Sequence, residues 1–123
     1  MSRTDTEKLI GNFLAALNKR DMTALAALLH RDVAHDGPDG QRTMGAEALR
    51  ESFFRQAAQF DETIADIVVM SDETGTHGAA EFTRRGTADG RRFTLRDALL
   101  FEVYDGRITR VSAAGGRDAL AGK

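Results

Sequence analysis

The stretch ADGRRFTLRDALLFEVYDG, residues 88–106, decides the fold. It places an Asp-Gly pair at each end of the longest strand pattern in the chain, Arg91–Tyr104. Asp-Gly between runs of alternating apolar residues is a strong local signal for a β-hairpin. Two such hairpins in succession predict an antiparallel meander, with strands at Thr76–Gly86, Arg91–Tyr104 and Arg107–Ala113.

The central strand places one carboxylate, Asp97, on a face that is otherwise apolar. Because side chains alternate along a strand, this face also carries Phe93, Leu95, Leu99, Phe101 and Val103. A buried carboxylate needs a partner or becomes neutral. Asp97 is therefore a candidate base or hydrogen-bond donor. The alternative is a structural aspartate, bonded to an arginine on a neighbouring strand or to backbone N–H groups.

Helical patterns precede the sheet. Apolar residues at helical spacing predict three helices: from a capping box at Thr4–Glu7 to about Lys19, from the cap Asp21 to Leu29, and from Gly45 to about Gln59. Thr63–Met70 follows, rich in β-branched residues and apolar on both faces, which predicts a strand covered on both sides.

Helices followed by strands indicate an α+β fold for residues 1–123. We expect the three helices to pack into the concave face of a curved mixed or antiparallel sheet, as in a cone-like, cystatin-like roll. Such an interior suits a small ligand. The end of the chain, residues 113–123, is expected to be loose.

Residues 28–45, LLHRDVAHDGPDGQRTMG, have the composition of a site. A short strand, Val33–Asp36, ends at the only proline, Pro38. His35 and Asp36 point in opposite directions along a strand; a histidine beside a carboxylate is an ordinary general base, and equally an ordinary way to end a strand. Arg42 would either anchor an anionic ligand or tie down the turn through a neighbouring aspartate.

Composition excludes several classes of protein. The formal charge is −2 with no basic patch, so nucleic acid is not an expected partner, and the pair Arg84–Arg85 predicts a solvated strand. The chain has no cysteine, its three histidines lack metal-site spacing, and no glycine-rich phosphate loop is present, so we expect no metal and no cofactor. Neither a signal peptide nor a membrane span is expected, and the predicted location is the cytoplasm.

Several segments resemble the SnoaL-like, ketosteroid isomerase-related proteins of the nuclear transport factor two superfamily. The segments that carry the resemblance are Phe13–Asp21, Leu25–Leu29, Asp32–Asp36, Ile67–Met70, Ala79–Phe82 with Arg85–Thr87, and Leu100–Val103 with Asp105–Ile108. The resemblance implies the cone-shaped α+β fold and a homodimer that pairs through the sheet. It does not imply one reaction, because the superfamily includes isomerases, cyclases, dehydratases, epoxide hydrolases and binding proteins.

The polar residues of the true isomerases do not carry over. Along the matched segments, their general base falls on Gly37, and the two groups of their oxyanion hole fall on Phe13 and Leu99. The resemblance instead highlights His35–Asp36 and the turn from Arg42 to Gly45.

The sequence leaves three functions open. The first is a cofactor-free isomerase, lyase or hydrolase that acts on a small hydrophobic molecule and uses Asp97, His35 and Asp36 for acid–base chemistry. The second is a non-catalytic module that binds a small apolar ligand, and the third is a dimerising interaction domain. In the first two cases, the residues expected to contact the ligand are Phe13, Leu17, Arg42, Phe53, Glu81, Leu99 and Phe101. The small neighbours of Glu81 leave room for it to point into the cavity, but its pattern favours an exposed or interface position.

Overall fold

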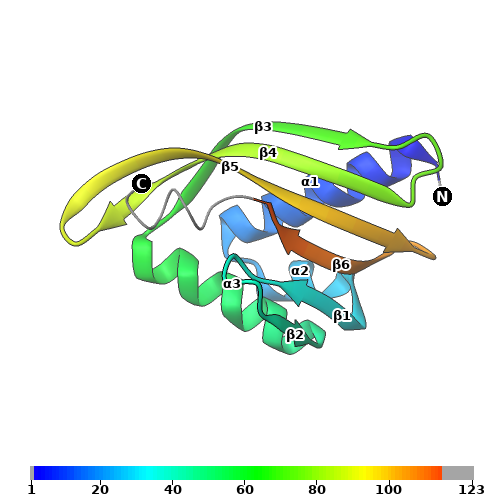
Figure 1. The fold of residues 1–123 in the computed structure, drawn as a ribbon, viewed down its shortest axis with the longest axis horizontal. Helices are drawn as coiled ribbons and strands as arrows, with labels where there is room; N and C mark the ends of the chain where they lie inside the picture. Colours follow the sequence, from blue (N-terminus) through cyan, green and yellow to red (C-terminus); the bar gives the residue numbers. More distant parts are fainter. Residues whose placement is uncertain (1, 115–123) are drawn as a thin grey trace.

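The computed structural model describes residues 2–114 and places three helices against a six-stranded sheet. In chain order the elements are α1 (Arg3–Lys19), α2 (Met22–Leu28), β1 (Leu29–Asp36), β2 (Arg42–Met44), α3 (Ala46–Phe60), β3 (Thr63–Ser71), β4 (His77–Ala88), β5 (Arg91–Tyr104) and β6 (Arg107–Ala113). The strand order is β2-β1-β6-β5-β4-β3, and only the β1–β6 pair is parallel. The sheet is curved and unclosed, with the helices on its concave side (Figure 1), which confirms the predicted α+β fold.

The core joins α1 and α3 to the long strands. The Phe13 ring of α1 lies edge-on to Phe53 of α3, with ring centroids 5.6 Å apart, and edge-on to Phe101 of β5 at 5.3 Å. Edge-to-face rings at these distances add to the hydrophobic gain from burial. This aromatic cluster fixes how far the helices stand from the sheet.

The predicted meander is confirmed, and β5 and β6 have the predicted bounds. Both Asp-Gly pairs adopt positive φ, 51° and 76° at Asp89 and Gly90, and 51° and 78° at Asp105 and Gly106. Two successive left-handed residues match the right-handed twist of the flanking strands, so each turn sets its hairpin register.

Two helix starts can be compared with the sequence. The capping box of α1 was predicted at Thr4–Glu7, but it is formed by Ser2, whose hydroxyl accepts from Asp5 N, and by Asp5, whose carboxylate accepts from Ser2 N. The helix therefore starts earlier, at Arg3, because Ser2 supplies the extended cap conformation. Asp21 caps α2 as predicted, by accepting from Ala24 N at 3.0 Å.

Three strand predictions need correction. β1 begins at Leu29, not Val33, because Leu29 pairs with Ile108 of the parallel β6 and both side chains become buried. The predicted turn also contains β2, which pairs with β1 as a short hairpin. β3 is an edge strand that is not covered on both sides: Ile67, Val68 and Met70 are exposed.

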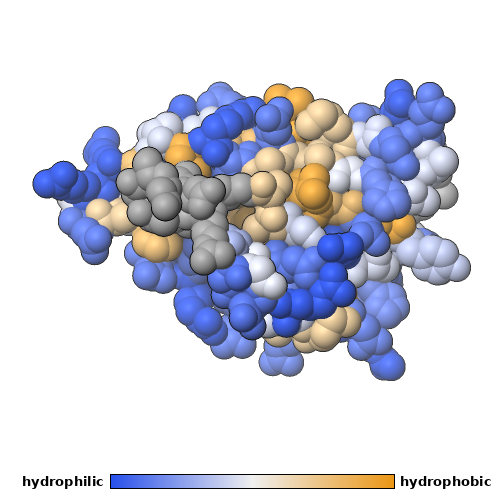
Figure 2. Space-filling model, viewed as in Figure 1, coloured by the Kyte–Doolittle hydropathy of each residue, from blue (hydrophilic) through white to orange (hydrophobic). Residues whose placement is uncertain are grey.

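The convex side of the sheet, here called the outer face, carries no helix of the described chain. Figure 2 shows apolar atoms gathered over the middle strands, between hydrophilic ends of the molecule. At the end of β6, Ala114 N donates to Ala98 O at 3.2 Å, so the loose tail expected from residue 113 does not include residues 113 and 114. The rest of that tail, residues 115–123, lies outside the described residues. No helix in residues 2–114 is long and apolar enough to cross a membrane.

Candidate functional site

A cavity opens between α3 and the inner face of the sheet, with about 750 Å³ of empty volume, part of it open to solvent. Its apolar lining consists of Leu17, Pro38, Phe53, Ala57, Ile64, Phe82, Leu99 and Ala113. Its polar lining consists of Arg20, His35, Ser52, Gln56, Glu62, Arg84 and Asp97. Polar groups in such a setting are either satisfied by one another or available to a ligand.

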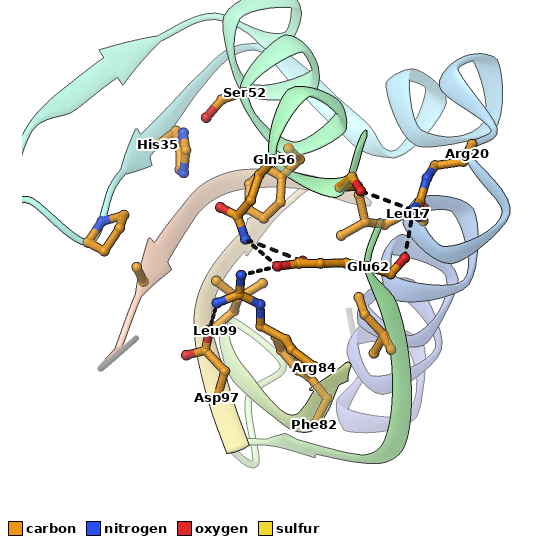
Figure 3. A pocket seen from close by; sticks show the side chains of 15 residues that line it. Leu17, Arg20, His35, Ser52, Gln56, Glu62, Phe82, Arg84, Asp97 and Leu99 are labelled. Carbon is orange, nitrogen blue, oxygen red and sulfur yellow. Dashed lines mark hydrogen bonds and ion pairs between the residues drawn. The ribbon is translucent and has the colours of Figure 1, made fainter. Parts of the chain in front are cut away.

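Three of these side chains, Glu62, Arg84 and Asp97, form a charged triad (Figure 3). Arg84 NH1 donates to Asp97 Oδ2 at 3.2 Å, and Arg84 NH2 donates to Glu62 Oε2. Arg84 is only 3% exposed, and the Asp97 side chain is 12% exposed. Buried charges of this kind are stable only when paired, so the triad holds its members in fixed positions.

Strand register explains how the triad forms. Phe82 of β4 pairs with Asp97 of β5, and Arg84 is one inward position further along β4. Arg84 and Asp97 are therefore diagonal neighbours on the same face, within reach of a long side chain. The backbone amide of Ala98 also donates to Asp97 Oδ1, at 2.8 Å.

Glu62 reaches the cavity because of the way α3 ends. Asp61 adopts φ 48°, and Glu62 N donates to Ala57 O at 2.9 Å, which closes the helix and turns the chain toward β3. Arg20 supports this joint from the end of α1, since its NH2 donates to Ala57 O at 3.3 Å and to Glu62 O at 2.6 Å. The joint between α3 and β3 is thus held from two sides.

His35 of β1 faces the cavity, and its side chain packs against Phe53 with ring centroids 5.0 Å apart. Burial lowers the pKa of His35 from its ordinary value of 6.5, an effect that the nearby charges of Asp36 and Asp39 oppose in part. Burial therefore favours the neutral form of the imidazole. No group in residues 2–114 hydrogen-bonds to its ring nitrogens.

Asp36, the neighbour of His35, lies on the outer face and does not line the cavity. It accepts from Arg42 Nε at 2.6 Å, from Arg110 Nε at 2.8 Å and from Ser112 Oγ at 2.9 Å. These hydrogen bonds, that from Arg42 above all, hold the pKa of Asp36 well below its ordinary value. The two residues therefore do not form a His–Asp pair, because alternation along β1 sends them to opposite faces.

The other predicted ligand residues divide into three groups. Leu17, Phe53 and Leu99 line the cavity as expected. Phe13 and Phe101 belong to the buried core and are not among the cavity-lining residues. Arg42 and Glu81 are exposed: Arg42 ties down the turn through Asp36, and Glu81 pairs with Ala98 on the outer face, so neither lines the cavity.

Sequence reasoning missed several polar residues of the cavity. Arg84 was expected on a solvated strand, but only Arg85 is exposed, because the two alternate in direction. Ser52 and Gln56 lie one turn apart on α3, so they share one face of the helix. The sequence pattern did not identify that face as the one that points into the cavity. Among residues 2–114, no group of three or more histidine or carboxylate side chains is placed to hold a metal ion.

Residues 10–111 match the family model of the SnoaL-like domain. The chain belongs to the SnoaL-like family. None of the curated proteins matches this SnoaL-like chain.

Solved structures support the same family. A candidate polyketide cyclase from Xanthomonas campestris pv. campestris is 31% identical, with 97% of this chain and 96% of that chain covered and a TM-score of 0.86. A candidate polyketide cyclase from Pseudomonas putida KT2440 is 34% identical, with 89% and 90% covered and a TM-score of 0.81. An epoxide hydrolase from M. tuberculosis, 24% identical with 90% and 82% covered and a TM-score of 0.71, shares the fold.

In this SnoaL-like chain, the positions that the resemblance matches to the polar residues of the true ketosteroid isomerases are occupied by Phe13, Gly37 and Leu99. These three positions carry no ionisable side chain. The ionisable groups of the cavity are instead His35, Arg20 and the charged triad. Among the described residues, these are the groups of the cavity that could carry acid–base chemistry.

Proposed function

We propose that this protein is a cofactor-free acid–base enzyme that moves a proton on a small, hydrophobic, oxygen-bearing molecule. The observation that carries the proposal is the His35 imidazole, which faces the cavity and whose ring nitrogens have no hydrogen-bond partner within residues 2–114. A neutral imidazole within hydrogen-bond reach of a substrate proton is an effective general base near pH 7.

Asp97 supplies a second proton-accepting group on another wall of the cavity. Two such groups can take a proton from one position of a ligand and return one at another, as isomerases, cyclases and dehydratases require. The outward position of Arg42 removes it as a group that stabilises an oxyanion.

The relatives favour a carbonyl-bearing substrate. The two candidate polyketide cyclases described above are 31% and 34% identical to this chain, and proton abstraction beside a carbonyl begins such a cyclisation. The epoxide hydrolase supports the fold alone at 24% identity. A reaction through an enolate is therefore our first candidate.

The proposal predicts that the protein exchanges the α-protons of 2-tetralone, an uncharged bicyclic ketone, for deuterium in D2O faster than buffer alone does. The exchange is followed by 1H NMR. We expect His35→Gln to slow this exchange by about 100-fold or more, as loss of a general base does, and Asp97→Asn by about tenfold or more. The exposed His30→Gln is the matched control and should exchange at the wild-type rate.

The pH dependence gives a second readout of the same prediction. Because burial lowers the pKa of His35, the base stays neutral to a pH below 6.5, and exchange should be lost only under more acidic conditions. A folded His35→Gln protein that exchanges as fast as wild type would show the proposal to be wrong.

A non-catalytic binding module is the second candidate. It is favoured by the state of Asp97, whose two oxygens already accept from Arg84 and from the Ala98 amide, as a structural aspartate would. In that case 2-tetralone would bind to wild type and to both variants with equal affinity and show no exchange above the buffer rate.

We also propose that the protein acts in the cytoplasm as a homodimer that pairs through the outer face of the sheet. Exposed apolar side chains on that face, Val68, Met70 and Leu100, support a surface that a second copy would cover.

A further inference from the structure

The two guanidinium groups of the cavity, those of Arg84 and Arg20, already have hydrogen-bond partners within the described chain. Arg84 directs one terminal nitrogen to Asp97 and the other to Glu62, and its buried Nε faces neither water nor a partner in the described chain. Arg20 donates to the backbone carbonyls of Leu17, Ala57 and Glu62 at the far end of the cavity (Figure 3). Neither guanidinium is thus held ready for an anion.

The uncommitted polar groups are uncharged and lie on the wall formed by β1 and α3. The Ser52 hydroxyl and the His35 ring have no hydrogen-bond partner within residues 2–114. The Gln56 amide nitrogen makes only long contacts to the Glu62 carboxylate, at 3.4 and 3.5 Å, and the Gln56 carbonyl oxygen has no partner within residues 2–114. In Figure 3, Ser52 and Gln56 project from one face of α3, with His35 beside them.

Binding of an anion in this cavity would be unfavourable. It would lose its hydration among Phe53, Phe82 and Leu99 and would meet two fixed carboxylates, with no free cation among the cavity-lining residues of the described chain. An uncharged oxygen, in contrast, would find a hydroxyl and an amide able to donate or accept, in a site where unmet polar groups are costly.

We infer that Ser52 and Gln56 are specificity-determining residues, which hydrogen-bond the oxygen of an uncharged ligand beside His35, and that the cavity rejects carboxylates. This inference rests on the proposed function, because it places the ligand's oxygen where His35 would take the neighbouring proton.

The test uses three probes that share one ring: benzyl alcohol, toluene and benzoate, titrated at pH 7.5 against protein labelled with 13C, with the His35 ring resonances as readout. We expect benzyl alcohol to bind at least about tenfold more tightly than benzoate. Ser52→Ala and Gln56→Ala should each weaken benzyl alcohol by about three- to tenfold, the value of one hydrogen bond, and leave toluene unchanged. The exposed Gln59→Ala on the same helix is the matched control.

The outcomes separate this inference from the proposed function. Benzoate binding as tightly as benzyl alcohol, or equal losses for toluene and benzyl alcohol in both variants, would overturn the inference and leave the role of His35 intact. Absence of binding by all three probes, toluene included, would overturn the inference together with the proposed ligand cavity. Normal selectivity with no exchange of 2-tetralone would support the inference and count against the enzyme.

Discussion

Arg84 compensates the negative charges of two carboxylates in the interior of this protein. It is 3% exposed and is the cation of the charged triad, between Glu62 and Asp97. Two carboxylates in one apolar site repel each other strongly unless a cation separates them. The same residue therefore governs stability and the position of Asp97.

We predict that Arg84→Met destabilises the protein by about 3–5 kcal/mol, because removal of one partner leaves buried charges uncompensated. The exposed neighbour Arg85→Met should change the free energy of unfolding by less than about 0.5 kcal/mol. Urea unfolding of both variants provides the measurement. Combining Arg84→Met with Glu62→Gln and Asp97→Asn should recover much of the loss; an equal loss in the triple variant would mean that packing, not charge, explains the effect.

The hairpin turn, together with the alternation of side chains along the strands, was enough to predict which residues lie next to Asp97. A two-residue turn at Asp89–Gly90 pairs Ala88 with Arg91, and counting outward from that pair brings Phe82 opposite Asp97 and Arg84 next to it. The partner of Asp97 was thus predictable from the hairpin register. Glu62 was not, because its direction depends on one left-handed residue, Asp61, at the end of α3.

At the scale of the elements, the close contact between the end of α3 and β4 fixes the turn between α3 and β3, which carries Glu62. At Gly86 of β4 a Cβ atom would meet the backbone oxygen of Phe60, the last residue of α3, and would lie 2.9 Å from the Phe93 ring. A backbone oxygen at the end of a packed helix cannot move aside cheaply. Glycine is required here for close approach, not for a turn.

Gly86→Ala should therefore destabilise the protein by about 1–3 kcal/mol through overpacking. Gly11→Ala is the matched control: nothing lies within 4 Å of its Cβ position inside α1, so alanine should stabilise the helix by about 0.5–1 kcal/mol. Urea unfolding should give opposite signs for the two variants. A Gly86→Ala protein as stable as wild type would show that α3 and β4 do not meet at this point.

Element prediction failed where long-range pairing overrides local pattern. Leu29 continues the helical apolar stripe of α2, yet it joins β1 because Ile108 of the parallel β6 pairs with it. β3 was predicted to be covered on both sides from its apolar residues, but a strand's position at the edge of a sheet depends on the order of all strands. Local composition carries no information about that order.

For the whole molecule, the outer face is the surface left over once the helices have covered the concave face. Cross-strand pairing brings Met70, Ala79 and Leu100 into one row across β3, β4 and β5, and Leu100 is 51% exposed. Beside this row, Asp36 accepts hydrogen bonds from Arg110 and Ser112, so these polar side chains have partners within the chain. An apolar centre with a satisfied polar border is typical of a protein–protein interface.

We predict that the wild-type protein sediments at micromolar concentration with about twice the mass of one chain, and that Leu100→Asp sediments as a folded monomer. A carboxylate at the centre of the row would be desolvated without a partner in the dimer but would remain hydrated in the monomer. Met22→Asp is the control, since Met22 is similarly exposed but lies on α2, away from the sheet. A wild-type monomer at this concentration, or a Leu100→Asp dimer as tight as wild type, would contradict pairing through this face. Because the cavity opens on the opposite side of the sheet, 2-tetralone exchange should persist in the Leu100→Asp monomer.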